Sequence, residues 1–293
     1  MTTASSSARW SIDSEYGPLR EVLLSRPDNY QWIATNSIAE RTLGAGTGLD
    51  HQKLQAQYRE LEDALTGAGV TLHYTDSEAH LPYQVYTRDS SQITPWGPVL
   101  TQLFRPQRRG EYHSLLKFYG GLDGIWNFST KGTLEGGDIH IIRPGLCVVG
   151  HSGERTDEAG AAQFAGWLRD EGWEVRLQPF DDYFLHLDLL FSAIGDGVAL
   201  ACHTVLDQGF VDWLTAHGIR TIDVGYREAV HHMGCNVLAL GNDRIVSPKH
   251  CQAVNDKLRA EGFTVLDPEL ELFAMGGGSV HCMTMPLKRD SLA

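Results

Sequence analysis

The chain has 293 residues, of which 42% are apolar, and a formal net charge of −13 at pH 7. Its length and apolar content allow one large core, and its negative charge argues against nucleic-acid partners and mildly favours small cationic ones. No apolar stretch is long enough to span a bilayer, and residues 1–9 lack the apolar segment of a signal peptide. We therefore expect a cytoplasmic protein with a single domain over residues 1–293, of which residues 1–9 form a disordered tail.

The first predicted strand covers residues 20–24, and the helix after it carries an apolar stripe at helical spacing. Residues 85–119 then indicate a strand, a turn at residues 95–98, a second strand and a helix. The stripe of the first helix consists of Leu54, Tyr58, Leu61 and Leu65.

The next three stretches repeat one order, which is a strand hairpin, a helix and a further strand. Each hairpin is indicated by two apolar runs around a turn of Gly, Pro, Asn or Asp, and each helix by apolar residues at helical spacing. The copies cover residues 134–177, 185–224 and 236–266, and Thr156 is the predicted N-cap of the first of their helices. Hairpin, helix and strand therefore form the repeating unit.

A fifth copy is divided between the two ends of the chain. Residues 280–285 would supply its first strand and residues 20–24 its second. Joining the ends in one sheet closes the row of units and protects the sheet edges. The sequence therefore predicts an α/β fold, namely a closed five-bladed α/β propeller with pseudo-fivefold repeats of two strands, a helix and a strand.

Five reactive side chains recur along these units at intervals of 46, 51, 50 and 46 residues. We expect each of them in the opening strand of its unit. If the units surround an axis, the five side chains converge on one pocket. They are Asp89, Glu135, His186, Asn236 and Cys282.

Cys282 follows three glycines, Gly276 to Gly278, which leave room for a ligand close to the backbone. The five cysteines show no paired spacing, and their odd number favours reduced thiols over a disulfide framework. Because Cys282 is in phase with His186, we interpret it as a nucleophile. His186, with a reference pKa of about 6.5, suits a general acid and base.

Four segments, in this order, resemble the signature of the guanidine-modifying pentein superfamily, which includes arginine deiminases, dimethylarginine dimethylaminohydrolases and amidinotransferases. The resemblance covers the chain from Leu19 to Leu287. It implies a five-bladed propeller and a cysteine hydrolase without cofactor or metal, acting on a small cationic guanidino substrate. The segments are Thr87-Arg88-Asp89, Leu134-Glu135-Gly136-Gly137-Asp138, His186-Leu187-Asp188 and the glycine-rich segment that ends in Cys282.

The resemblance also implies roles for single residues. Cys282 would be the nucleophile, His186 the general acid and base, and Glu135 the partner of His186. Asp89 and Asp188 would bind the guanidinium. These roles suit the chemistry, because a guanidinium is a resonance-stabilised cation that needs carboxylates to hold it and a strong nucleophile to attack it.

Further substrate-binding candidates lie nearby. Arg155 resembles the family arginine that holds a substrate carboxylate. Asp138 is either a binding residue or an ordinary turn residue. An arginine-rich segment contains Arg105, Arg108 and Arg109, and of these we retain Arg105 as a candidate for binding a substrate carboxylate. The alternative is that the segment is only the solvated start of a helix.

The carboxylates expected around Cys282 raise the pKa of its thiol above the usual value of about 8.5, so the free site should hold the thiol protonated. A bound guanidinium about 4 Å from the sulfur contributes about 4 kcal/mol at an effective dielectric near 20, which lowers that pKa by about 3 units. We therefore hypothesise that the substrate activates its own nucleophile.

Several alternatives remain open at this level. Hydrolysis and amidino transfer begin with the same covalent intermediate, and the chain length favours hydrolysis. The length resembles dimethylarginine dimethylaminohydrolase, whereas His186-Leu187-Asp188 resembles the deiminase pattern. Tyr83 stands where relatives commonly have Asn or Asp near the amino-acid head group. A decarboxylated or otherwise modified guanidino compound is therefore an alternative to arginine.

Two other functions rank lower. A manganese ureohydrolase with ligands from Asp138, His140, His186 and Asp188 would leave Cys282 unexplained. A binding propeller without activity would not need the nucleophile.

Other features stay undecided. The length and the glycines of residues 29–48 are typical of either a lid over the pocket or a disordered surface loop. Asn236, like His231, His232 and His281, is more typical of a structural role. The sequence is compatible with a homo-oligomer but does not indicate one.

Overall fold

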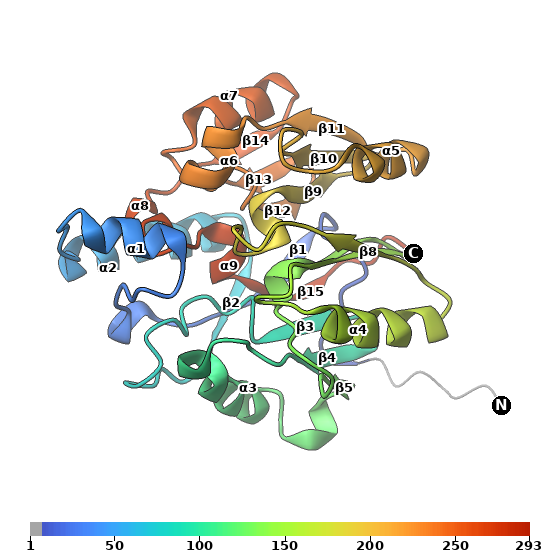
Figure 1. Ribbon diagram of the computed structural model, residues 1–293, viewed down its shortest axis with the longest axis horizontal. Coiled ribbons are helices and arrows are strands. Elements are labelled where there is room, and N and C mark those ends of the chain that lie inside the picture. The colour runs from blue at the N-terminus through green and yellow to red at the C-terminus, as the bar shows by residue number, and fades with distance from the viewer. Residues whose placement is uncertain (1–7) are drawn as a thin grey trace.

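The computed structural model describes residues 8–293, so residues 1–7 of the tail predicted for residues 1–9 lie outside the described residues. The strands form five sheets of three strands each (Figure 1). In spatial order they are β15 (Met285–Arg289), β1 (Leu19–Leu24) and β2 (Thr71–Tyr74); β3 (Ser91–Thr94), β4 (Gly97–Leu100) and β5 (Asn127–Phe128); β6 (Ile139–Arg143), β7 (Leu146–His151) and β8 (Glu174–Pro179); β9 (Phe191–Gly195), β10 (Val198–Ala201) and β11 (Arg220–Asp223); and β12 (Leu238–Gly241), β13 (Arg244–Val246) and β14 (Thr264–Leu266).

All five sheets share one topology. The middle strand pairs antiparallel with the first strand and parallel with the third. A helix precedes the third strand because a parallel pair needs a crossover. This confirms the predicted order of hairpin, helix and strand. The crossover helices are α2 (His51–Gly67), α3 (Tyr112–Phe118), α4 (Glu158–Asp170), α5 (Gln208–Ala216) and α7 (Gln252–Ala260).

The two ends of the chain share one sheet, as predicted. Val22 of β1 lies opposite Pro286 of β15 in an antiparallel pair. The expected first strand at residues 280–285 is wrong, because residues 280–283 form the short helix α9 (Val280–Met283). Within it the Met283 amide donates to the Ser279 carbonyl at 2.9 Å, a local bond that takes the place of pairing with another strand.

Capping residues fix where the helices begin. Asp50 accepts hydrogen bonds from the amides of Gln52 and Lys53 at the start of α2, whose predicted apolar stripe is buried. The predicted N-cap of α4 is off by one residue, since Asp157, not Thr156, accepts from the Gly160 amide.

The remaining helices and 3-10 turns are α1 (Ser37–Gly44), α6 (Tyr226–His232), α8 (Glu271–Ala274), η1 (Pro27–Asn29), η2 (Pro106–Glu111), η3 (Leu122–Gly124), η4 (Gly136–Asp138) and η5 (Leu187–Leu189).

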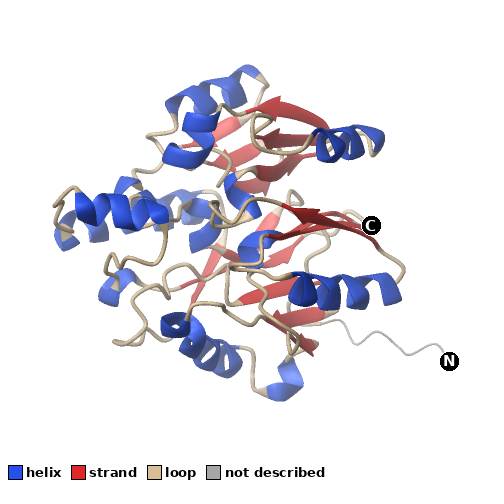
Figure 2. Cartoon of the chain, viewed as in Figure 1, coloured by secondary structure: helices blue, strands red, loops and turns tan. Residues whose placement is uncertain are grey.

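The strands gather towards the middle of the molecule, and most of the longer helices lie at its periphery (Figure 2). First strands of neighbouring sheets touch: β15 lies beside β3, β9 lies beside both β6 and β12, and β12 also contacts β1. Because each first strand faces this shared interior, the segments that lead into the first strands are brought near one another.

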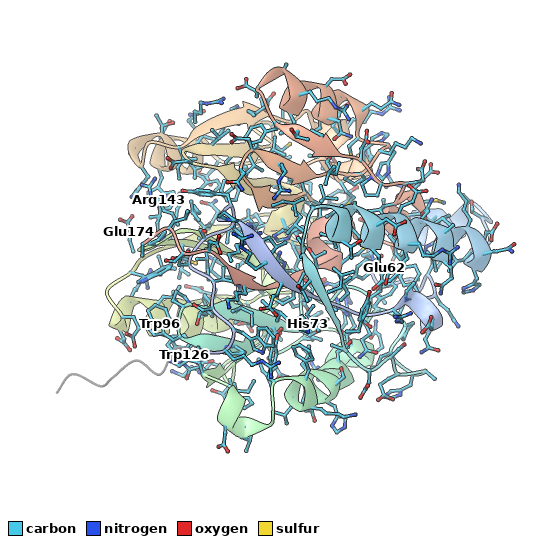
Figure 3. All side chains as sticks on the ribbon, turned by 180° about the vertical axis from the view of Figure 1, so that it is seen from behind. Glu62, His73, Trp96, Trp126, Arg143 and Glu174 are labelled. Carbon is cyan, nitrogen blue, oxygen red and sulfur yellow. The ribbon has the colours of Figure 1, made fainter. Side chains whose placement is uncertain are left out.

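On the back of the molecule, contacts between tryptophan rings connect the sheet β3–β4–β5 with the sheet β6–β7–β8. Trp96 and Trp126 stack with their ring centroids 5.0 Å apart (Figure 3). Trp96 also meets Trp173, which precedes β8 of the next unit, edge to face at 5.6 Å. Among residues 8–293, no helix has the length and apolar character needed to cross a bilayer.

Candidate active site

The five evenly spaced side chains enter the interior just before the first strand of each sheet. Our expectation that they stand within the opening strands is therefore wrong. Glu135 and His186 occupy the residue before the 3-10 turns η4 and η5, and Cys282 lies in α9. Asp89 and Asn236 precede β3 and β12. At these positions a side chain is free of the alternation that a strand imposes, so it can be directed towards a common point.

Hydrogen bonds and ion pairs join these side chains in two groups. His186 Nε2 lies 2.7 Å from Glu135 Oε2, and His186 Nδ1 lies 3.7 Å from Asp89 Oδ1. Asn236 Nδ2 donates to Cys282 Sγ at 3.1 Å. One small buried pocket unites the groups, and it is lined by Asn36, Tyr83, Tyr86, Asp89, Arg108, Arg155, Leu185, His186, Gly276, Gly277 and Cys282.

His186 is buried among carboxylates. Burial lowers the pKa of its imidazole, but Asp89 and Asp138 raise it more, so the pKa lies well above its usual value. The surroundings of His186 thus favour its protonated form, which can donate a proton.

Glu135 is completely buried, and each carboxylate oxygen has a partner. Oε1 accepts from the Phe104 amide at 2.9 Å, and Oε2 faces both His186 and, at 3.4 Å, Arg155. Burial raises the pKa of Glu135, but Arg155 and His186 outweigh burial and bring the pKa to about 2. Glu135 is thus a fixed anion that holds His186.

Cys282 is buried, and its surroundings favour the protonated thiol. Its thiol donates to Asp188 Oδ2 at 3.3 Å. Burial, followed by the negative charge of Asp188, raises the pKa of the Cys282 thiol to about 12. The direction agrees with the hypothesis that the free site disfavours the thiolate.

Asp188 lies beneath the nucleophile and does not line the pocket. Its Oδ2 also takes a hydrogen bond from His281 Nδ1 at 2.8 Å. Sequence reasoning treated His281 as an ordinary packing residue, although its position directly before Cys282 could have drawn attention to it. Behind it, Glu15 Oε2 lies 3.7 Å from His281 Nε2, and Arg88 NH1 lies 3.9 Å from Glu15 Oε1.

Asp89 faces the pocket but is already held by an arginine. Arg108 NH1 donates to Asp89 Oδ2 at 2.6 Å, and the same guanidinium binds both oxygens of Glu111. From the arginine-rich segment, the structure thus brings Arg108, not the retained Arg105, into the pocket. The sequence signal for this was the spacing of Arg108 and Glu111 on one helical turn.

Asp138 and Arg105 stand outside the inner pocket. Asp138 is buried under His186, where its Oδ1 accepts from the Leu187 amide at 2.8 Å, and burial raises its pKa to about 7. Arg105 lies in an outer cavity and pairs with Glu154 at 2.9 Å. Neither therefore faces the sulfur in the way the five spaced residues do.

Glycines allow the close packing of the site. A Cβ atom on Gly137 would lie 2.7 Å from ring atoms of His186, and one on Gly278 would lie 2.3 Å from the Tyr86 ring. Real Cβ contacts are longer, so any side chain at Gly137 would displace the imidazole. The glycine pair after Glu135 is thus explained by the ring it receives.

The segment predicted as a lid or a disordered loop, residues 29–48, is ordered over the pocket. Asn36 caps α1 and donates through Nδ2 to the Gly276 carbonyl at 3.2 Å. Thr42 Oγ1 donates to the Met275 carbonyl at 2.8 Å, and Thr35 offers its carbonyl to Arg155. The segment therefore covers the glycine-rich turn that precedes Cys282.

Two groups of side chains have metal-ligand geometry. Asp89, Glu135 and His186 offer ligand atoms that lie within 4.8 Å of one another. In this group Arg108 and Arg155 already neutralise the two carboxylates. An added cation would compete with both arginines. The other group is Glu15, His140 and His281.

Comparison with known proteins places this geometry in a family. The family model for eukaryotic N,N dimethylarginine dimethylhydrolase matches residues 30–289. The uncharacterized protein YkgA of Bacillus subtilis is 27% identical over 94% of this chain and 94% of its own length. The N(G),N(G)-dimethylarginine dimethylaminohydrolase of Mycobacterium tuberculosis is 27% identical over 82% of this chain and 77% of its own.

A solved structure extends the likeness to the fold. The N-terminal domain of ArgZ, a cyanobacterial arginine dihydrolase, was solved with a covalently bound reaction intermediate. It superposes with a TM-score of 0.78 at 20% identity, over 92% of this chain and 98% of that one. The chain therefore belongs to the N,N dimethylarginine dimethylhydrolase family, within the guanidine-modifying pentein superfamily.

Proposed function

We propose that the protein is a cysteine-dependent hydrolase that cleaves a C–N bond of an arginine-like guanidino compound. The products would be ammonia or an alkylamine and a ureido compound. The observation that carries the proposal is that Cys282, His186 and Asp89 line one buried pocket although they are remote in sequence. Two of the proteins named above, a dimethylarginine dimethylaminohydrolase and an arginine dihydrolase, are named for dimethylarginine and arginine, which supports the same substrate class here.

The same proposal includes the frame of the site. Contacts between neighbouring first strands support closure of the five units into a ring around the pocket. All five cysteines are free thiols, which supports a reducing, cytoplasmic compartment.

The first half of the reaction forms a covalent intermediate. The guanidinium enters beside Asp89, its positive charge lowers the pKa of Cys282, and the thiol proton leaves to solvent. The thiolate attacks the central carbon, and the protonated His186 gives its proton to the departing amine as the C–N bond breaks. A positively charged thiouronium then remains on Cys282.

The second half releases the product. His186, now neutral, takes a proton from a water molecule, which attacks the thiouronium carbon. The C–S bond breaks and the ureido product forms, while the second proton of the water passes to the departing sulfur, so that the Cys282 thiol is restored and His186 is again protonated. Glu135 stabilises the imidazolium in the resting state and at the end of each cycle, because it stays ionised at neutral pH.

The remaining residues have supporting roles in the proposal. Asp89 binds the guanidinium, and Asp188 accepts the hydrogen bond of the Cys282 thiol in the free enzyme and draws the cation towards the sulfur. Asp138 holds the His186 segment through the Leu187 amide. Arg155 and Arg105 line the outer cavity and contact the rest of the substrate.

Mass spectrometry of the purified protein incubated with arginine, methylarginines, agmatine and guanidino acids tests the proposal. Each substrate should be offered with and without an acceptor amine, so that amidino transfer is recognised by its product. We expect a ureido product from at least one substrate and none from Cys282→Ser, whose fold is checked by circular dichroism. Turnover by a folded Cys282→Ser would refute the mechanism.

A further inference from the structure

The inner pocket opens into a second cavity of about 230 Å³. The two share Asn36, Arg155 and Leu185, so a ligand can extend from one into the other. Tyr83, Tyr86 and Leu185 line the inner pocket, and their ring and aliphatic surfaces suit the alkyl stem of a guanidino compound. Whatever group a substrate carries at its far end must therefore be accommodated by the outer cavity.

Every arginine that lines the two cavities is already paired with a carboxylate. Arg108 binds Asp89 and Glu111 at 2.6 to 2.9 Å. In the outer cavity Arg105 binds Glu154 at 2.9 Å. Arg155, which borders both cavities, has Glu135 Oε2 at 3.4 Å and the Thr35 carbonyl at 3.3 Å. Each of these arginines thus already faces a protein carboxylate, although Nε of Arg105 has no hydrogen-bond partner within residues 8–293.

Carboxylates, in contrast, are left without partners. Glu40 and Asp182 line the outer cavity as exposed residues, and within residues 8–293 neither side chain has an ion pair or a hydrogen bond. In the inner pocket Asp89 is 2% exposed, and its Oδ1 has no hydrogen-bond partner in the described part of the chain. The outer cavity thus presents two carboxylates without ion pairs, whereas Asp89 in the inner pocket is paired with Arg108 through Oδ2 and keeps only Oδ1 open to a hydrogen-bond donor.

We infer that the natural substrate is a guanidino compound whose far end carries a cationic amine and no free carboxylate. Asp89 receives the guanidinium, and Glu40 and Asp182 receive the ammonium group. The inference rests on the function proposed above and narrows its substrate class. It departs from the carboxylate-holding role that the family resemblance implies for Arg155, because Glu135 already occupies that arginine.

The physical reason is the cost of an unmatched charge. An ammonium group beside two unpaired carboxylates gains attraction that a neutral end group lacks. A carboxylate there is repelled by the same two groups, and the arginines that could offset this repulsion already face protein carboxylates. We therefore expect the cavity to favour substrates with a cationic end group over those with a neutral one, and to disfavour those with an anionic one.

Three guanidino compounds with matched alkyl chains test the ranking. Agmatine carries a distal ammonium, butylguanidine a methyl group, and 4-guanidinobutyrate a carboxylate. We expect kcat/KM to fall in that order, by about tenfold at each step, as each charge interaction is worth about 1.4 kcal/mol. Arginine, which carries both charges, should rank below agmatine.

A double variant tests the residues. Glu40→Gln with Asp182→Asn should lower the ratio of kcat/KM for agmatine to that for butylguanidine by about tenfold. The matched control is Asp63→Asn, an exposed acid on α2 outside both cavities, which should leave the ratio at its wild-type value.

The outcomes separate this inference from the proposed function. If arginine or 4-guanidinobutyrate has a higher kcat/KM than agmatine, or if the double variant keeps the wild-type ratio, the substrate inference is wrong while guanidine hydrolysis stands. If neither these four compounds nor the methylarginines and guanidino acids of the first test react under conditions where Cys282 is alkylated by iodoacetamide, both the inference and the proposed function fail.

Discussion

Two buried polar clusters meet at Asp188, and only one of them opens onto a cavity. The front cluster contains Glu135 and His186, of which His186 lines the pocket that holds the sulfur of Cys282. The rear cluster contains Glu15 and His281 together with Arg88 and His140, and its members line none of the cavities described above.

The two clusters use the same residue types with opposite electrostatic results. In the front cluster carboxylates raise the pKa of His186 well above normal. In the rear cluster burial, followed by neighbouring His281, lowers the pKa of His140 to about 4. The difference between these two histidines follows from their contacts: His186 has Glu135 and Asp89 within 4 Å, whereas both ring nitrogens of His140 lack hydrogen-bond partners within the described residues.

The largest expected effect is the contrast between matched histidine variants. His186→Gln should lower kcat by about 10²- to 10⁴-fold, which is the usual contribution of a general acid and base. His281→Gln should cost far less, about tenfold, because His281 acts only through Asp188. Steady-state kinetics at pH 7.5 measure both. If both variants lose the same factor in kcat, the proposal that only the front cluster takes part in catalysis is wrong.

The second contrast concerns two buried thiols. In free enzyme Cys282 should show no thiolate absorbance below about pH 8, since burial and Asp188 raise its pKa to about 12. A bound guanidinium that is not hydrolysed should lower that pKa by about 3 units. Cys147 in β7, whose pKa is also raised by burial, should not respond to the ligand. The difference spectrum against Cys282→Ala isolates the signal, and a free-enzyme pKa below about 6 would exclude substrate activation.

Sequence reasoning reached the front cluster because its members are periodic. Asp89, Glu135, His186, Asn236 and Cys282 recur once per unit, so their convergence follows from any arrangement of equal units around an axis. The same periodicity revealed the order of hairpin, helix and strand and the sheet that joins both chain ends.

The rear cluster and the pairing of arginines had no such signal. Glu15 precedes the first unit, and Arg88 and His281 stand next to residues that had already been assigned a role. Which arginine enters the pocket depends on the path of η2, where Arg108 turns inward and Arg105 outward. Strand starts were placed too early because Leu134 before η4, and Leu187 and Leu189 in η5, resemble strand residues until tertiary contacts are known.

A smaller expected effect is the pH dependence contributed by His140. Its folded-state pKa of about 4 lies below the usual value of about 6.5, so the unfolded chain binds a proton between these values and the folded chain does not. Stability should therefore fall as the pH drops from about 7 to about 4, by at most about 3 kcal/mol from this residue.

His140→Phe isolates that contribution. Both ring nitrogens of His140 lack partners within the described residues, and its ring stacks on His281 and meets Phe191 edge to face, so a phenyl ring suits the site. Urea unfolding at several pH values should show a flatter acid limb for the variant than for the wild type. Parallel curves would mean that His140 is protonated in the folded protein, contrary to the contrast drawn here.

The smallest effect in this series separates steric fit from charge in the front cluster. Gly137→Ala adds one methyl group 2.7 Å from the His186 ring and leaves every charge in place. A displacement of the imidazole by about 1 Å should lower kcat by up to about 100-fold.

Gly166→Ala is the matched control, because a Cβ on this glycine of α4 meets nothing within 4 Å. This variant should raise stability by about 0.5 to 1 kcal/mol without loss of activity. If Gly137→Ala keeps full activity while its His186 pKa, followed by NMR, stays high, the charges around the imidazole matter more than its position. If activity and pKa fall together, the glycine is what lets Glu135 and Asp89 reach the ring, and the front cluster depends on backbone shape as much as on its carboxylates.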